Sequence, residues 1–463
     1  MELLNQDTEQ VGDQVEQGSS RFYYGWVIVF VCLVVMTLAA PLLASFSIFY
    51  VALLKGLNWS RGSAALGLAI FLVVNGLAGP LAGALIDRFN PRWVMASGTL
   101  ITAGALVWLS RMTTQWEFYV AYGVLASAGS SLIHIVPFAA IVSNWFMRYR
   151  GLALGAVTAG MGLGQVSIPL IQFMIDHIGW RRTYLVIGAA FFVIPTALIL
   201  LFLHSRPENR GLSLADERLP WRKPQRTKVL TQGDGQAIGV HSSKERESGY
   251  VVVNQQWAET DWTVARAIRT VPFWMLALLI TLFGAGYMLI NTQIVAYLTD
   301  KRYSSILAAS AVGLQGFIYI FGRFLGGALS DRIGREKALT LSAAIFILFL
   351  TLLYVSGMVV SPLLVYMSVI LYGIGGGMPL PVLMAAVGDI FQGKHLGKII
   401  GIIMLGGFLG GALGAWLGGF IFDRTHSYSS HFVLSALVTL ISAALIWKAR
   451  PSGVRVVRTA PVN

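Results

Sequence analysis

The sequence contains little charge for its length, since only 12% of its 463 residues are Asp, Glu, Lys or Arg. Soluble globular domains carry about twice that fraction. Hydrophobic residues make up 56% of the chain and the mean hydropathy is +0.69, so the composition excludes an ordinary soluble fold and predicts an integral membrane protein. The chain has one cysteine, Cys32, which excludes intramolecular disulfides.

The first twenty residues lack Lys and Arg altogether and contain five acidic residues, Glu2, Asp7, Glu9, Asp13 and Glu16. A secretory signal peptide needs a basic start followed by an apolar core, so this segment does not match one. We expect residues 1–22 to form a disordered cytoplasmic tail.

Twelve apolar runs are long enough to cross a bilayer, because a helix rises ~1.5 Å per residue and the hydrocarbon core is ~30 Å thick. They lie near residues 24–50, 63–86, 93–110, 118–142, 151–175, 183–204, 272–298, 306–329, 338–357, 362–388, 398–421 and 431–448. The sequence therefore predicts an all-α membrane protein with twelve transmembrane helices.

The positive charges predict the orientation. If both termini are cytoplasmic, the loops on the opposite side contain only Lys55, Arg61, Arg111, Arg181, Arg182, Lys301, Arg302 and Arg424 of the 34 Lys and Arg residues. This distribution agrees with the positive-inside rule and predicts an inner cell membrane protein with both termini in the cytoplasm. The net charge of +13 then reflects a cytoplasmic face beside anionic lipid, and it requires no nucleic acid.

The chain contains an internal repeat. Residues 83–92 read GALIDRFNPR and residues 327–335 read GALSDRIGR, and each segment follows the second helix of a six-helix set. Asp176 and Asp423 likewise follow the fifth helix of each set. The repeat predicts two six-helix bundles at residues 23–204 and 271–448.

Residues 205–270 contain no spanning run and are rich in charge, Gly, Gln and Ser. We expect a largely disordered cytoplasmic linker, with a short surface helix near residues 262–269, and a cytoplasmic C-terminal tail at 449–463.

The fifth and eleventh predicted helices contain regularly spaced glycines. These are Gly151, Gly155, Gly160 and Gly164 in the fifth, and Gly397, Gly401, Gly406, Gly410, Gly414 and Gly418 in the eleventh. Small residues at this spacing let helix backbones approach closely in lipid, so we favour tight packing. Such smooth surfaces can in addition let helices slide or rock.

The twelve helices, the six-plus-six repeat and the pattern G-x-L-x-D-R-x-G-R resemble the major facilitator superfamily. The pattern is complete in the second half, whereas Asn90-Pro91 interrupts it in the first. The resemblance implies a transporter and a conformational gating role for Gly83, Asp87, Arg88, Arg92, Gly327, Asp331, Arg332, Gly334 and Arg335. The residues themselves also allow a simpler role, in which Asp87 and Asp331 cap the next helix and pair with Arg92 and Arg335.

Arg323 is the only Lys or Arg well inside a predicted span. It lies roughly 12 Å along the helix from Asp331, near the middle of the bilayer, where a cation costs at least ~3 kcal/mol. No Asp or Glu falls in the middle of a predicted span. A substrate carboxylate would offset the cost, since a guanidinium binds it through two hydrogen bonds. The alternative is that Arg323 reaches cytoplasmic water or binds backbone carbonyls.

A narrower resemblance connects the chain with the monocarboxylate transporters and bacterial oxalate/formate carriers. It rests on Trp145-Phe146, Arg150-Gly-Leu-Ala-Leu-Gly155, Tyr24-Gly25-Trp26, Trp59-Ser60-Arg61 and Gly322-Arg323-x-x-x-Gly327. It implies that Arg323 grips the substrate carboxylate. The animal transporters carry an aspartate four residues before this arginine, where this chain has Tyr319, and their lysine in the first helix is also missing.

Further polar residues are candidates for the wall of a substrate cavity. Tyr319 shares a helix face with Arg323. His134, Gln165, Asn291 and Tyr372 lie in the fourth, fifth, seventh and tenth predicted helices. His134 could donate to the substrate, carry a proton or bond to a neighbouring helix, and the other three could instead join helices by hydrogen bonds.

These observations together predict a secondary active transporter that moves a small organic monoanion, such as lactate, pyruvate or formate, by alternating access. The alternatives are an anion exchanger of the oxalate/formate type and a nutrient receptor built on a transporter fold. The sequence contains no GxxxxGK[ST] or HExxH motif, so we expect neither an enzyme nor a cofactor or metal site. The expected partners are the bilayer, the organic anion and a proton or counter-anion, and we expect a monomer.

Overall fold

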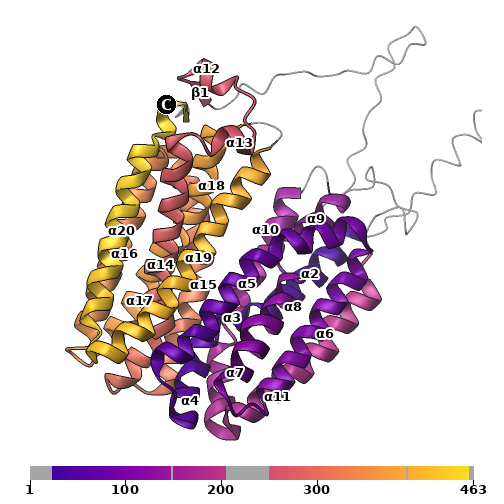
Figure 1. Ribbon diagram of the computed structural model, residues 1–463, viewed down its shortest axis with the longest axis vertical. Helices are drawn as coiled ribbons and strands as arrows, with labels where there is room; N and C mark the ends of the chain where they lie inside the picture. Colours follow the sequence, from indigo (N-terminus) through magenta and orange to yellow (C-terminus); the bar gives the residue numbers. More distant parts are fainter. Residues whose placement is uncertain (1–22, 147–149, 205–249, 393–394, 458–463) are drawn as a thin grey trace, which may run out of the picture.

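The computed structural model describes residues 23–146, 150–204, 250–392 and 395–457. The side chain of Asp87 is one of those within these ranges that it does not describe. Figure 1 shows two helical bundles that lie side by side, one built from helices before residue 204 and the other from helices after residue 270. Two short strands and two short helices lie at one end of the second bundle. We refer to this end of the molecule as the linker end.

The first bundle is made of elements from residue 25 to residue 202. They are α2 (Gly25–Ala39), α3 (Pro41–Ala44), α4 (Phe46–Leu57), α5 (Arg61–Arg88), α6 (Pro91–Leu109), α7 (Gln115–Phe118), the π-helix η1 (Tyr119–Ala126), α8 (Ser127–Ser131), α9 (Ile135–Trp145), α10 (Arg150–Gln165) and α11 (Ile168–Phe202).

The second bundle and its extensions begin at residue 250. The elements are β1 (Tyr250–Val252), α12 (Gln255–Ala258), α13 (Val264–Ala267), α14 (Val271–Asp300), α15 (Ser305–Ile333), α16 (Arg335–Ser356), α17 (Pro362–Gly377), α18 (Pro379–Ile390), α19 (Leu396–Thr425), α20 (Ser429–Ala449), the 3-10 helix η4 (Pro451–Gly453) and β2 (Arg455–Val457).

Ten stretches of the described chain are long and apolar enough to cross a membrane. One of them, residues 153–202, is 50 residues long and turns at Gly179, whose φ of 79° and ψ of 156° are non-helical. A positive φ favours glycine, so this residue lets two crossings follow each other almost without a loop. The interrupted segment from Gln115 to Trp145 supplies one more crossing. The all-α fold with twelve crossings is therefore as predicted.

Four of the crossings are interrupted, and the fifth crossing breaks between Gln165 and Ile168. The first breaks around Pro41 and Ser45, and the tenth breaks at Met378, just before Pro379. The fourth breaks between Ser131 and Ile135. The sequence predicted continuous helices at 24–50 and 118–142, and the hydropathy that defined them does not report breaks of this kind.

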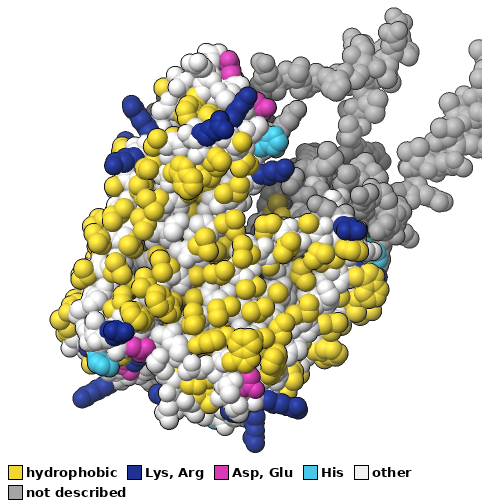
Figure 2. Space-filling model, in the orientation of Figure 1, with side chains coloured by type: hydrophobic (Ala, Val, Ile, Leu, Met, Phe, Trp, Pro, Cys, Tyr) yellow, Lys and Arg dark blue, Asp and Glu magenta, His cyan; other side chains and the backbone are white. Residues whose placement is uncertain are grey.

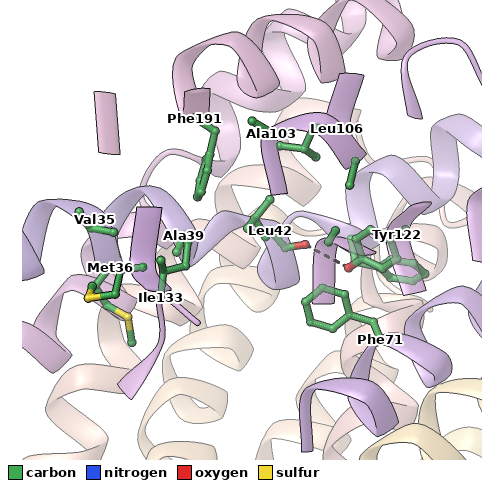
Figure 3. Close-up of a cluster of buried hydrophobic side chains, with 14 of the residues drawn as sticks. Val35, Met36, Ala39, Leu42, Phe71, Ala103, Leu106, Tyr122, Ile133 and Phe191 are labelled. Carbon is green, nitrogen blue, oxygen red and sulfur yellow. Dashed lines mark hydrogen bonds between the residues drawn. The ribbon is translucent and has the colours of Figure 1, made fainter. Parts of the chain in front are cut away.

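The core of the first bundle is a large cluster of apolar side chains. Figure 3 shows side chains from several crossings, among them Leu42, Phe71 and Leu106, gathered around Tyr122. The hydroxyl of Tyr122 donates to the carbonyl oxygen of Leu42 at 3.0 Å, so the polar tip of this buried ring is satisfied. Apolar side chains also cover much of the outer surface of both bundles, as expected for contact with lipid (Figure 2).

The last part of the predicted linker, from residue 250 onward, is folded. Strand β1 pairs antiparallel with β2, with Tyr250 opposite Val457. Trp257 donates from Nε1 to the carbonyl of Ile390 at 2.9 Å, and the ring of Trp262 lies 5.1 Å from that of Phe391. The expected surface helix near 262–269 corresponds to α13. Residues 205–249 lie outside the described chain.

The glycines of the eleventh crossing bring α19 directly against α14. A Cβ atom at Gly410 would lie 1.9 Å from the carbonyl oxygen of Thr281, and one at Gly414 would lie 2.0 Å from that of Ala285. The two backbones are therefore in contact, and the tight-packing interpretation of these glycines holds for this helix pair.

The two bundles meet at the end away from the linker. In Figure 1 they are in contact near α4 and separate toward the linker end. The contact includes α5 against α19 and α10 against α15. A Cβ atom at Gly419 would lie 2.4 Å from the carbonyl oxygen of Arg61, so the bundles touch through their backbones here.

Candidate functional site

Arg323 lies on α15 at the interface between the bundles. Its Nη1 atom lies 3.9 Å from the sulfur of Met161 on α10, and its guanidinium carbon lies 5.1 Å from the centre of the Tyr319 ring. Its Nε atom is buried and has no hydrogen-bond partner among the described residues. The ion pairs of the described chain all lie elsewhere. The positive charge at this depth is therefore not neutralised by the described protein.

A cavity of about 210 Å³ opens beside this arginine between α10 and α15. Gln165, Tyr319 and Arg323 all line it, so the structure brings together three of the predicted site residues. The wall from α10 also includes Thr158 and Met161, which the sequence analysis did not single out. The sequence could have indicated these two residues through their position among the small residues of α10.

Asn291 and Tyr372 lie in a second layer behind Tyr319. The amide of Gln315 donates to the hydroxyl of Tyr287 at 3.3 Å and to Oδ1 of Asn291 at 3.4 Å. The hydroxyl of Tyr372 donates to the same Oδ1 atom at 3.3 Å. The ring centres of Tyr287 and Tyr319 are 6.1 Å apart. This network holds Asn291 and Tyr372 away from the cavity wall and supports Tyr319.

One polar atom of this network is unused. The Oε1 atom of Gln315 is buried and has no partner among the described residues. Buried polar atoms are normally hydrogen-bonded. Oε1 of Gln315 and Nε of Arg323, both on α15, are two exceptions. Of the two residues, Arg323 lines the cavity and Gln315 does not.

His134 occupies the break in the fourth crossing. It precedes α9 with φ −113° and ψ −167°, so it is not inside a continuous helix as predicted. It does not line the cavity beside Arg323 in the described structure, although the two side chains are within electrostatic range of each other. A residue at a helix break has backbone groups that the helix does not use, which distinguishes it from an ordinary helical histidine.

The predicted motif of the second half forms an ion-pair network at the linker end. Arg335 donates from Nη1 to Asp331 at 2.5 Å and to Ser330 at 2.7 Å, and from Nε to Asp389 at 2.9 Å. Gly334 precedes α16 with a φ of 93°, a conformation that favours glycine. The expected pairing of Asp331 with Arg335 is confirmed, and Asp389 is an additional partner that the sequence did not reveal.

The other motif residues are arranged differently. Asn90, not a carboxylate, caps α6 by accepting from the backbone N–H of Arg92 at 3.1 Å. The Nε atom of Arg92 has no partner among the described atoms, and the expected pair with Asp87 falls outside the described side chains. Arg88 and Arg332 are exposed, and a Cβ atom at Gly327 would meet nothing within 4 Å. Gly83 is half-buried in α5.

A second network closes the opposite end. Arg61 at the start of α5 forms an ion pair with Asp300 of α14 at 2.6 Å and donates to the hydroxyl of Tyr428. Its guanidinium also lies 3.6 Å from the centre of the Phe422 ring. These contacts join one bundle to the other. The sequence placed Arg61 in an outer loop but did not predict its partners.

Comparison with known proteins places this architecture in a family. The family model described as Major Facilitator Superfamily matches residues 25–381 and 312–461. The chain belongs to the major facilitator superfamily. Members of this superfamily are transporters and not enzymes, so the chain is a multi-pass membrane transporter.

Similar superfamily members include named transporters. The chain is 24% identical to monocarboxylate transporter 13 of Bos taurus over 91% of this chain and 88% of that protein. It is 24% identical to the MFS-type transporter YcxA of Bacillus subtilis, covering 83% and 85%. A bacterial homologue of the human lysosomal transporter Spinster, crystallised in an inward-facing and occupied conformation, has a TM-score of 0.67 at 14% identity, covering 93% and 97%. A mutant of the nucleoside transporter NupG has a TM-score of 0.65 at 14% identity, covering 91% and 100%.

Proposed function

We propose that this transporter moves a small organic monoanion by alternating access and that Arg323 binds the carboxylate of the substrate. The supporting observation is the buried, unpartnered Nε atom of Arg323 beside the cavity between α10 and α15. A cation in the middle of a bilayer is costly unless something neutralises it. A carboxylate would do so through two parallel hydrogen bonds.

The surroundings of Arg323 favour one negative charge. Tyr319 and Gln165 offer neutral polar groups, and the cavity lining contains no second Lys or Arg among the described residues. A cavity of about 210 Å³ fits a small molecule. The relatives named monocarboxylate transporters agree with this class of substrate. An exchanger of the oxalate/formate type is the second candidate, and a dianion would favour a second cation.

Alternating access is supported by the position of the network that joins the two bundles. The contacts of Arg61 join the bundles at the end away from the linker, whereas the bundles diverge at the linker end (Figure 1). With both termini in the cytoplasm of an inner-membrane protein, this arrangement corresponds to an inward-facing state. We further propose that the Asp331–Arg335–Asp389 network adjusts the balance between inward-facing and outward-facing states.

Uptake into liposomes with the purified protein tests the proposal. Arg323→Lys keeps the charge but loses the planar fork, so carboxylate uptake should fall by roughly 100-fold while the protein still inserts. Arg111→Lys, at an exposed position away from the cavity, is the matched control. Near-normal uptake by Arg323→Lys would contradict the substrate role. Substrate binding without any uptake by the wild type would instead favour a nutrient receptor.

A further inference from the structure

A groove of about 590 Å³ lies at the linker end, between the folded linker segment and the end of α20. Its lining includes Asn254, Gln255, Pro272, Lys448 and Arg450. Lys448 and Arg450 are both exposed, and no Asp or Glu belongs to this lining within the described chain. The groove therefore combines two positive charges with two side-chain amides.

Arg450 adopts a conformation that is unusual for its residue type. It follows the last turn of α20 with φ 49° and ψ 60°, a left-handed position where glycine is the common residue. Its Cγ atom would lie 3.2 Å from a Cβ atom at Gly453, so the side chain folds over η4 at the wall of the groove. A charged side chain therefore occupies a position whose backbone conformation favours glycine.

The groove lies directly beyond an apolar surface. Val271 and Trp274 in the first turn of α14 are 66% and 58% exposed, and Trp447 near the end of α20 is 52% exposed. Tryptophan is enriched at the level of lipid headgroups. Figure 2 shows basic side chains at this end of the molecule above the hydrophobic surface. The positive groove and the lipid-facing surface are thus continuous.

We propose that this groove binds the phosphate of an anionic phospholipid, with the acyl chains against the exposed face of α14 and α20. Lys448 and Arg450 supply the charge for the phosphate, and the amides of Asn254 and Gln255 supply donors for the glycerol or headgroup. A soluble phosphate would use the same charges but not the apolar surface. The site is independent of the cavity beside Arg323.

Lipid binding to the detergent-purified full chain tests this site, with native mass spectrometry and melting temperature as readouts. Phosphatidylglycerol should bind and raise the melting temperature, whereas phosphatidylcholine should not. The double variant Lys448→Gln with Arg450→Gly should bind phosphatidylglycerol roughly 30-fold more weakly, because each surface cation contributes about a factor of five. Glycine suits the backbone of position 450, so this variant should melt in phosphatidylcholine like the wild type.

The control removes the same charge elsewhere. Lys55→Gln with Arg111→Gln, both exposed at the opposite end, should bind phosphatidylglycerol like the wild type. Equal losses in the two double variants would overturn the proposal in favour of diffuse attraction. An equal shift with inorganic phosphate would identify a site for soluble anions, and the absence of any preference for phosphatidylglycerol in the wild type would exclude the site.

Discussion

Asp423 at the end of α19 accepts the backbone N–H of Gly62 at the start of α5, at 2.7 Å, and that of Arg61 at 3.0 Å. The repeat-related carboxylate of Asp176 accepts from the hydroxyl of Ser305 at the start of α15, at 3.0 Å. Each bundle thus places a carboxylate at the N-terminus of a helix in the other bundle, where the helix dipole favours it. Both contacts must break when this end of the transporter opens.

Removing the first of these contacts should favour opening. Asp423→Ala loses two charge-assisted hydrogen bonds, each worth about 1.5–3 kcal/mol, so the ratio of closed to open molecules should fall at least 10-fold. Pulsed electron resonance between spin labels at Lys55→Cys and Ser430→Cys, in a chain with Cys32→Ser, measures the distance across this end. A longer distance population is expected.

A carboxylate in one bundle provides the control for that experiment. Glu117 accepts the backbone N–H groups of Thr113 and Thr114 at 2.6 and 2.9 Å, all within the first bundle. Glu117→Ala should leave the distance distribution unchanged. If both variants broaden it equally, the effect would reflect general loosening and not the contact between bundles.

The neutral-for-charged substitution Arg323→Leu should help folding while abolishing transport. It removes a mid-membrane cation that costs a few kcal/mol, and it also removes the main attraction for a carboxylate. The variant should melt at or above the temperature of the wild type without ligand, and short carboxylates should not shift its melting temperature. A melting temperature well below that of the wild type would make Arg323 a structural link between helices.

Gly316 should limit how closely the bundles approach beside the cavity. A Cβ atom at this position would lie 2.4 Å from Cβ of Gln165 on the other bundle. Gly316→Val should therefore push the bundles apart and reduce uptake at least 10-fold, with little change in expression. Gly104→Val on α6 is the control, because a Cβ atom there would meet nothing within 4 Å. Unchanged uptake by Gly316→Val would show that this contact relaxes easily.

The ion-pair network at the linker end should contribute to stability. The side chain of Arg335 is 4% exposed, and Asp389→Ala removes one of its two carboxylate partners. Breaking a buried pair from one side costs about 3 kcal/mol or more, so the melting temperature should fall by several degrees. Arg332→Gln, at an exposed position in the last turn of α15, should change the free energy of unfolding by less than about 0.5 kcal/mol.

Proton coupling should depend on His134 if it exists at all. No carboxylate lies in the middle of a predicted span, so this imidazole is the remaining group there that titrates near neutral pH in its unperturbed state. Acid-stimulated uptake should be weak in the wild type or absent in His134→Gln. Strong stimulation that survives the substitution would mean that the proton uses another route or enters with the substrate.

The sequence predicted what depends on composition and periodicity. Hydropathy located the twelve crossings, the repeated motif located the two halves, and the isolated charge of Arg323 identified the cavity. It did not predict the break before His134, because a break depends on neighbouring helices that satisfy the released backbone groups. It also missed the contacts of Arg61 and the folding of residues 250–270, since these depend on partners more than a hundred residues away in the chain.

The contact between α14 and α19 has a mechanical consequence. Gly410 and Gly414 each face one particular carbonyl of α14, so an axial shift would bring a side chain against a backbone that has room for none. The two helices therefore cannot change register, and the second bundle moves as a rigid body. A displacement at Asp423, on one end of α19, must then appear at the other end of the same helix, some 40 Å away.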